Sequence, residues 1–201
     1  LRTLRLYSTV SKDKKVFLLT GRYINEKTPQ KYSVNQFIFN DLFTENANNT
    51  KQFSENKMQF AGIEGHLLDK KKNGDLLELK IGNQLRIDDL NTRFELLQNK
   101  NNLAFPNGYQ NQLTYTTNDL YLSAKYRFKL NNFSLLTQAD AHQLFNQLEN
   151  FNIKSNQNPF FIMPKIGLDW KINEKNKILT SYSLNTSNAG VLDVYSGFVQ
   201  T

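Results

Sequence analysis

The stretch that decides the fold is LELKIGNQLRID, residues Leu77–Asp88. Successive residues of a β-strand point to opposite faces of a sheet, so alternation of apolar and polar residues predicts a strand with one face of each kind. Every second residue from Leu77 to Ile87 is apolar except Asn83, and the residues between them are Glu, Lys, Gly, Gln, Arg and Asp. This stretch therefore predicts a β-strand with one apolar face and one largely charged face.

The same alternation recurs along most of the chain. It is equally clear in Leu120–Lys129 and Ile162–Lys171, and no segment shows a comparably strong helical period. Weaker versions occupy Thr3–Val10, Val16–Ile24, Met58–Leu68, Phe133–His142 and Lys177–Leu184. The sequence predicts an all-β fold of about eight antiparallel strands.

The connections between these strands alternate in length. Four are short and turn-like, and one of them contains Asn73-Gly74, the strongest short signal for a β-hairpin; they are Ser11–Lys15, Lys70–Asp75, Leu130–Asn132 and Asn173–Asn176. The segments Asn25–Lys57, Gln98–Asn118 and Gln143–Pro159 are long, polar and expected to be loops. Outer-membrane β-barrels have short periplasmic turns and long outer loops, whereas loops of this length are uncommon in compact soluble domains. The pattern predicts a segment of an antiparallel transmembrane β-barrel.

Composition is compatible with this interpretation. The hydrophobic fraction is 39%, but a barrel strand needs an apolar residue at every second position only. The absence of cysteine excludes disulfide scaffolds, thiolate zinc sites and iron–sulfur clusters. Aromatic residues gather near the expected turns, as in the girdles of membrane barrels: Phe17, Tyr126, Phe128, Phe133 and Trp170.

The net charge of +7 is spread along the chain. Lysines cluster in two of the expected turns, at Lys12, Lys14 and Lys15 and again at Lys70–Lys72. We interpret them as solvated turn residues, with contact to anionic lipid headgroups as the alternative. A nucleic-acid partner is not expected, because its binding site would concentrate the charge on one face or tail.

Two stretches resemble known barrel strands: PKIGLDWKIN, residues Pro164–Asn173, and KILTSYSL, residues Lys177–Leu184. They are similar to strands of the outer-membrane TonB-dependent receptors of Bacteroidota, and Val194–Thr201 looks like an outer-loop segment of the same family. The composition, rich in Asn and Lys and without Cys, is also typical of that group. The resemblance implies a plug domain inside a barrel of about 22 strands, with TonB and a surface lipoprotein as partners. Nothing in the sequence resembles the plug or the TonB-contacting segment.

The polar faces of the expected strands supply the candidate site residues. In a wide barrel they would line a hydrated interior, because lipid penalises each charge at mid-membrane by about 2–4 kcal/mol. These lumen-facing candidates are Glu64, His66, Glu78, Lys80, Arg86, Lys125, Arg127, Asp140, His142, Lys165 and Asp169. Glu64 with His66 and Asp140 with His142 have spacings compatible with a metal, but we interpret them as wall residues. We expect no enzyme activity and no cofactor.

The sequence thus predicts that residues 1–201 form part of one outer-membrane barrel domain, in a receptor for TonB-dependent nutrient uptake at the cell outer membrane. The alternatives are a complete eight-stranded membrane barrel acting as an adhesin or structural protein, a passive porin segment, and a soluble β domain that binds glycans. The chain begins within a strand pattern at Leu1 and stops in an expected loop at Thr201. We therefore expect Thr3–Val10 and Lys177–Leu184 to be edge strands that do not pair with each other.

Overall fold

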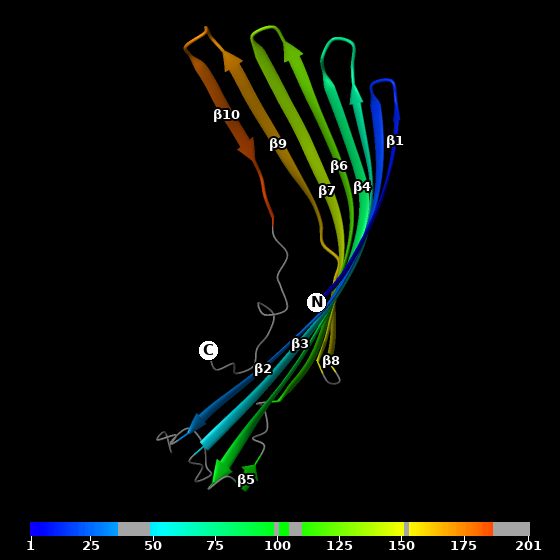
Figure 1. Ribbon diagram of the computed structural model, residues 1–201. Helices are drawn as coiled ribbons and strands as arrows, with labels where there is room; N and C mark the ends of the chain where they lie inside the picture. Colours follow the sequence, from blue (N-terminus) through cyan, green and yellow to red (C-terminus); the bar gives the residue numbers. More distant parts are fainter. Residues whose placement is uncertain (36–48, 99–100, 105–109, 151–152, 187–201) are drawn as a thin grey trace.

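A computed structural model describes residues 1–35, 49–98, 101–104, 110–150 and 153–186. They form one antiparallel sheet of ten strands, drawn in Figure 1. The strands are β1 (Arg2–Lys12), β2 (Lys15–Asn35), β3 (Asn49–Lys70), β4 (Leu76–Gln98), β5 (Asn101–Ala104), β6 (Asn111–Leu130), β7 (Phe133–Asn150), β8 (Ile153–Gln157), β9 (Phe160–Lys171) and β10 (Lys177–Ser183). The all-β, antiparallel prediction is confirmed.

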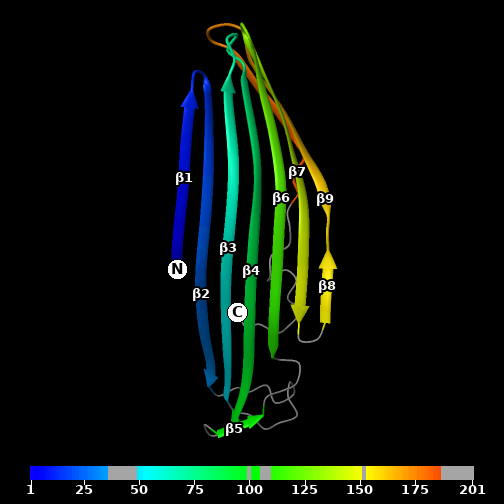
Figure 2. The ribbon, with the colours of Figure 1, turned by 90° about the vertical axis from the view of Figure 1, so that its right-hand side faces the viewer.

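Eight strands follow one another across the sheet in chain order. The path is β1-β2-β3-β4-β6-β7-β9-β10, with β5 attached to β4 and β8 to β7. Each of the eight predicted strands is present, and four short turns join their ends at the top of Figure 1. We call this end of the sheet the turn end. Figure 2 shows the strands side by side in a single layer, and no helix or second sheet is present among the described residues.

The turn of β3 and β4 shows why these connections are tight. Gly74 has a φ of 91°, which is favourable only for a residue without a Cβ. The Asp75 side chain accepts a hydrogen bond within the turn from Asn73 Nδ2 at 2.8 Å. It also links the turn to β6 by accepting a hydrogen bond from the Lys129 backbone N–H at 2.8 Å. The hydrogen bond from Lys129, with help from Asn73 and Tyr126, holds the pKa of Asp75 below its usual value.

The predicted long loops are wrong over much of their length. β2 continues to Asn35 and β3 starts at Asn49, so these strands pair residue by residue from Asn25 opposite Gln59 to Asn35 opposite Asn49. The other two predicted loops are similarly occupied by extensions of β4, β6 and β7 and by the short β5 and β8. In these extensions a ladder of backbone hydrogen bonds forms without the regular apolar alternation of the predicted strands. The remaining parts, residues 36–48, 99–100, 105–109 and 151–152, and the Val194–Thr201 run, lie outside the described residues.

The sheet does not close on itself. β1 pairs with β2 alone and β10 with β9 alone among the described strands. The prediction that Thr3–Val10 and Lys177–Leu184 do not pair is confirmed. What the structure establishes is an open antiparallel sheet, so the predicted barrel and its insertion in a membrane remain predictions.

One face of the sheet is apolar over all eight strands of the main path. Residues directly opposite each other in an antiparallel pair point to the same face, so the pairing identifies each row of this face. The central row, from β2 to β9, is Leu19, Gly65, Ile81, Leu122, Ala141 and Ile162. We call this side the apolar face. It is the more exposed side, with 59% of Ile81 and 53% of Leu122 accessible.

A small buried cluster lies far from the turn end. Leu90 and Leu113 oppose each other on β4 and β6, and Tyr115 opposes Leu148 on β7. These residues form the hydrophobic core, with Leu148 partly buried against it. The core of the described residues is therefore confined to one end, and the apolar face is not part of it.

Candidate functional site

All eleven candidate site residues lie on one face, opposite the apolar face. The pairing shows this directly, since His66 opposes Lys80, Glu78 opposes Lys125, and Lys125 opposes Gln138 in line with Lys165. Glu64, Arg86, Arg127, Asp140, His142 and Asp169 occupy neighbouring rows of the same side. We call this side the charged face. The shared face is confirmed, and its orientation toward a barrel interior stays a prediction.

Glu78 is the centre of the largest charge cluster. Its carboxylate lies 2.8 Å from Lys125 Nζ and 3.5 Å from Lys80 Nζ. His66 Nε2 lies 3.0 Å from Glu78 Oε1 without the alignment of a hydrogen bond. The side chains of Glu78 and His66 are only 14% and 15% exposed. The side chains of this cluster are thus more enclosed than Ile81 and Leu122 on the apolar face, because they lie across neighbouring strands and cover one another.

A second group is built around Tyr121. Its ring crosses Gly82 on β4, and its hydroxyl donates to Glu64 Oε2 on β3 at 2.5 Å. A Cβ at Gly82 would lie 2.5 Å from the Tyr121 ring and hydroxyl, so glycine is required for this crossing. Thr20, Glu64, Gly82, Tyr121, His142 and Phe161 form one continuous row of opposed residues.

His142 belongs to the same row. Its ring stacks on Phe161 at 5.2 Å and on Tyr121 at 5.6 Å between ring centroids. Its Nδ1 lies 3.0 Å from both carboxylate oxygens of Asp119. The imidazole is thus held between two rings and oriented by a carboxylate on the charged face.

The other candidates divide into paired and unpaired groups. Arg86 makes a two-point contact with Asp88, at 2.6 and 3.0 Å. Asp140 accepts a hydrogen bond from Gln138 at 2.8 Å, and Asp169 lies 2.9 Å from Lys177 Nζ. Arg127 and Lys165 have no ion pair with any described residue.

The two spacings compatible with a metal do not produce a site among the described residues. His66 contacts Glu78 instead of Glu64, and His142 contacts Asp119 instead of Asp140. No group of three or more His, Asp or Glu able to hold a metal occurs in the described part of the chain. Both histidines instead belong to the pattern of paired charges on the charged face.

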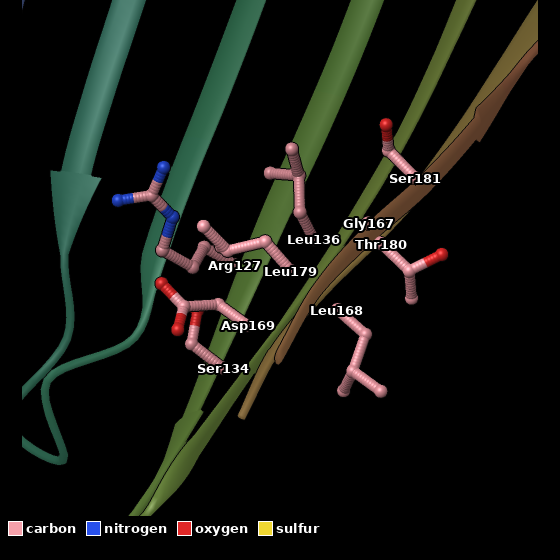
Figure 3. Close-up of a pocket in the computed structure, with 9 residues that line it drawn as sticks. All are labelled: Arg127, Ser134, Leu136, Gly167, Leu168, Asp169, Leu179, Thr180 and Ser181. Carbon is pink, nitrogen blue, oxygen red and sulfur yellow. The ribbon is translucent and has the colours of Figure 1, made fainter. Parts of the chain in front are cut away.

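A hollow of about 350 Å³ opens on the charged face near the turn end (Figure 3). Arg127, Leu136, Asp169 and Ser181 point into it, and Gly167 forms part of its floor. Leu168 and Thr180 also border it, but they belong to the apolar face, and Figure 3 shows their side chains turned the other way. The hollow combines the Arg127 guanidinium, which has no ion pair with a described residue, with the Asp169 carboxylate, the Ser181 hydroxyl and apolar side chains.

Sequence reasoning missed the role of several partners on this face. Asp119 and Asp88 hold His142 and Arg86, and Gly82 makes room for Tyr121. The alternation placed Gly82, Asp88 and Tyr121 on the correct side, but a single strand pattern does not tell which residue of the next strand lies opposite.

Comparison with known proteins gives no family for this chain. No protein-family model matches the sequence, and no curated protein matches it either. Among the described residues, no helix is long and apolar enough to cross a membrane. The two faces of the sheet are therefore the features of the molecule that bear on its function.

Proposed function

We propose that this sheet is part of the wall of an outer-membrane β-barrel, with the apolar face toward lipid and the charged face toward the interior. The observation that carries the proposal is the distribution of exposure over the two faces. The continuous apolar face carries exposed large hydrophobic residues on all eight strands, whereas the charge cluster around Glu78 on the opposite face is enclosed and paired. In water this arrangement is unfavourable by about 25 cal/mol for each Å² of apolar surface left uncovered, and lipid removes that cost.

The apolar face has the height that a bilayer requires. On β4 it extends from Leu77 to Ile87 and is followed by Asp89, Asn91 and Arg93 on the same side. A membrane-spanning strand needs about 9–11 residues at a tilt of about 45°, which is the length of this segment. The strands then extend well past it, as expected for a barrel whose outer parts stand above the membrane.

Aromatic residues border the apolar face at both of its ends. Phe17, Phe128, Phe133 and Trp170 lie on it near the turn end, and Tyr23, Phe145 and Phe160 lie on it toward the other end. Aromatic girdles at both lipid–water interfaces are typical of membrane barrels. This feature favours a membrane over a soluble sandwich, in which the aromatic rings would gather in the middle of the core.

The proposal extends to function: the barrel is a receptor for energised, TonB-dependent uptake of a nutrient. Two things support this extension, namely the similarity of Pro164–Asn173 and Lys177–Leu184 to such receptors and the open sheet. An eight-stranded barrel has an interior just wide enough for side chains, where unpaired charge is expensive. Arg127 and Lys165, which have no ion pair with a described residue, suit a wider, hydrated lumen. A passive porin segment is the second candidate, because its wall would have the same two faces.

An uptake experiment separates these two candidates. In cells that produce the intact protein, outer-membrane localisation is tested first by fractionation and resistance to extraction with carbonate. Uptake of the nutrient that a deletion strain fails to import is then measured with and without a protonophore. A TonB-dependent receptor stops importing when the proton-motive force collapses, whereas a porin continues, and recovery in the soluble fraction would contradict the membrane proposal itself.

A further inference from the structure

Two turns that are far apart in the sequence lie side by side in the sheet. The turn of β1 and β2 and the turn of β3 and β4 are joined by a hydrogen bond from the Lys70 backbone N–H to the Lys14 carbonyl oxygen at 3.0 Å. Lys15 also lies directly opposite Asp69. The two lysine clusters thereby become one surface, the lysine patch, made of Lys12, Lys14, Lys15, Lys70, Lys71 and Lys72.

Six lysines outnumber the three carboxylates near the lysine patch; Asp69 and Asp75 are already engaged, and Asp13 in the β1–β2 turn is exposed. Asp69 is 7% exposed and bound to Lys71 Nζ at 2.6 Å. Asp75 is 6% exposed and accepts hydrogen bonds from Lys129, Asn73 and Tyr126. The other five lysines of the patch are exposed and have no ion pair with any described residue. The surface therefore presents positive charge that the protein itself leaves unbalanced.

The position of the lysine patch relative to the apolar face indicates which partner balances its positive charge. Phe17 and Leu67 oppose each other on the apolar face, two residues from Lys15 and Asp69. Val10 lies opposite Phe17 on the neighbouring strand. The charges thus begin where the apolar surface and its aromatic border end, and a flexible lysine side chain can reach into the headgroup layer from there. Anionic headgroups attract such juxtamembrane basic residues strongly.

We propose that the lysine patch binds the phosphate headgroups of anionic phospholipids in the leaflet on the turn side. This inference rests on the proposed membrane orientation and adds a lipid preference to it. The preference is strongest over β1 to β4, where the six lysines of two turns gather. The turn of β9 and β10 contains three lysines, Lys171, Lys175 and Lys177, and Lys177 is bound to Asp169.

The test uses tryptophan as a local reporter of lipid identity. The chain has a single tryptophan, Trp170, on the apolar face of β9. A Phe17→Trp, Trp170→Phe variant moves the reporter next to the lysine patch, and Val10→Trp with Trp170→Phe is the second version if the first does not fold. The intact protein is reconstituted in phosphatidylcholine vesicles containing either brominated phosphatidylglycerol or brominated phosphatidylcholine, since bromine quenches tryptophan by contact.

We expect the reporter at position 17 or 10 to show a preference of about threefold or more for the brominated anionic lipid at low salt. Trp170 in the unmodified protein should show a weaker preference, and high salt should abolish the difference. Replacing Lys12, Lys14, Lys15, Lys70 and Lys72 by Gln should remove the preference, with Lys71 retained because it holds Asp69. The matched control should leave the lipid preference unchanged. It replaces five lysines toward the other end of the sheet, namely Lys27, Lys31, Lys51, Lys57 and Lys154.

The outcomes separate this inference from the function on which it rests. Equal quenching by both lipids would overturn the lipid preference and leave the membrane orientation standing. A preference that survives the five-lysine patch variant, or that the control variant removes as well, would also overturn it. Quenching by neither lipid would mean that β1 and β2 are not in contact with the bilayer, and the membrane proposal would fail together with this one.

Discussion

Gly82 is the residue on which the arrangement of the Tyr121 row depends. The Tyr121 ring occupies the space where any other residue would place its Cβ. We expect Gly82→Ala to displace the ring and break the Tyr121–Glu64 hydrogen bond, at a cost of about 0.5–1.5 kcal/mol. The measurement is the free energy of unfolding in urea. Gly21→Ala is the matched control, because its new Cβ would lie 3.9 Å from the Leu6 Cβ in ordinary contact.

The interaction between Gly82 and Tyr121 can be isolated by a double-mutant cycle. With Tyr121→Ala already in place, Gly82→Ala should cost much less than in the unmodified protein. Equal costs in the two backgrounds would contradict the proposed crossing of the ring over Gly82.

Leu122 tests the assignment of the faces. It lies in the middle of the apolar face, between Ile81 and Ala141. If this face meets lipid, Leu122→Arg should destabilise the protein by about 2–4 kcal/mol, as measured by refolding of the intact protein into lipid. Lys165→Leu on the charged face is the matched control and should have a small effect, because Lys165 has no ion pair among the described residues. Similar losses from both variants would contradict the assignment.

Asp75 makes the stability of one turn depend on pH. Its pKa is lowered in the folded state, chiefly by the hydrogen bond from the Lys129 backbone N–H. The folded carboxyl group therefore binds a proton less readily than the unfolded one, whose pKa is 3.8. This stabilisation is present well above pH 3.8 and is lost as the pH falls through the lower pKa of the folded state. In urea unfolding, Asp75→Asn should be less stable than the unmodified protein at pH 7, and the difference should shrink near pH 3.

At this scale the sequence predicted faces correctly and partners poorly. The face on which Glu78, His66 or Lys125 lies follows from the alternation of side chains along its own strand. That His142 contacts Asp119, one strand away, depends on the register between β6 and β7. Register is set by the length of the turn and by all neighbouring rows together, so a single strand does not contain it.

At the scale of strands and turns, the four hairpin turns were predictable and the strand lengths were not. Turns depend on local chemistry such as Asn73-Gly74, whereas the extension of β2 from Asn25 to Asn35 depends on the partner strand β3. The sequence TPQKYSV in this extension has no regular alternation, and only the hydrogen bonds to β3 make it a strand.

Gly74 is the residue of the β3–β4 turn whose replacement should destabilise the hairpin. With a φ of 91°, any side chain at this position is strained, and the penalty for a left-handed residue is about 1–2 kcal/mol. We expect Gly74→Ala to destabilise the β3–β4 hairpin by roughly this amount in urea unfolding. Lys72→Ala in the same turn is the control and should change stability little, because Lys72 is exposed and has no ion pair with a described residue.

At the scale of the whole molecule, the two edges of the sheet are its main unsatisfied feature. β1 and β10 each present backbone groups without a ladder partner among the described residues. In lipid each unpaired backbone group costs several kcal/mol. In the proposed barrel, β1 and β10 therefore each pair with a further strand, and these further strands complete the wall between the two edges.

Disulfide trapping in the intact protein tests the separation of these edges, and the absence of native cysteine makes the background clean. The pair Leu6→Cys and Tyr182→Cys, from β1 and β10, should not cross-link under oxidation. The pair Leu6→Cys and Gly21→Cys should do so readily, because the Cβ positions lie 3.9 Å apart within the range of a disulfide. Efficient cross-linking of the first pair, seen as a mobility shift, would indicate a small closed barrel.

The order of the strands has a consequence for the kinetics of folding. On the main path the strands pair in chain order, with only the short β5 and β8 lying between successive partners in the chain. Loop-closure entropy is then lost in small steps, one hairpin after another. The sheet can grow strand by strand from any turn that forms early. The Asn73–Asp75 turn, which is held by side-chain hydrogen bonds, is well suited to nucleate this growth.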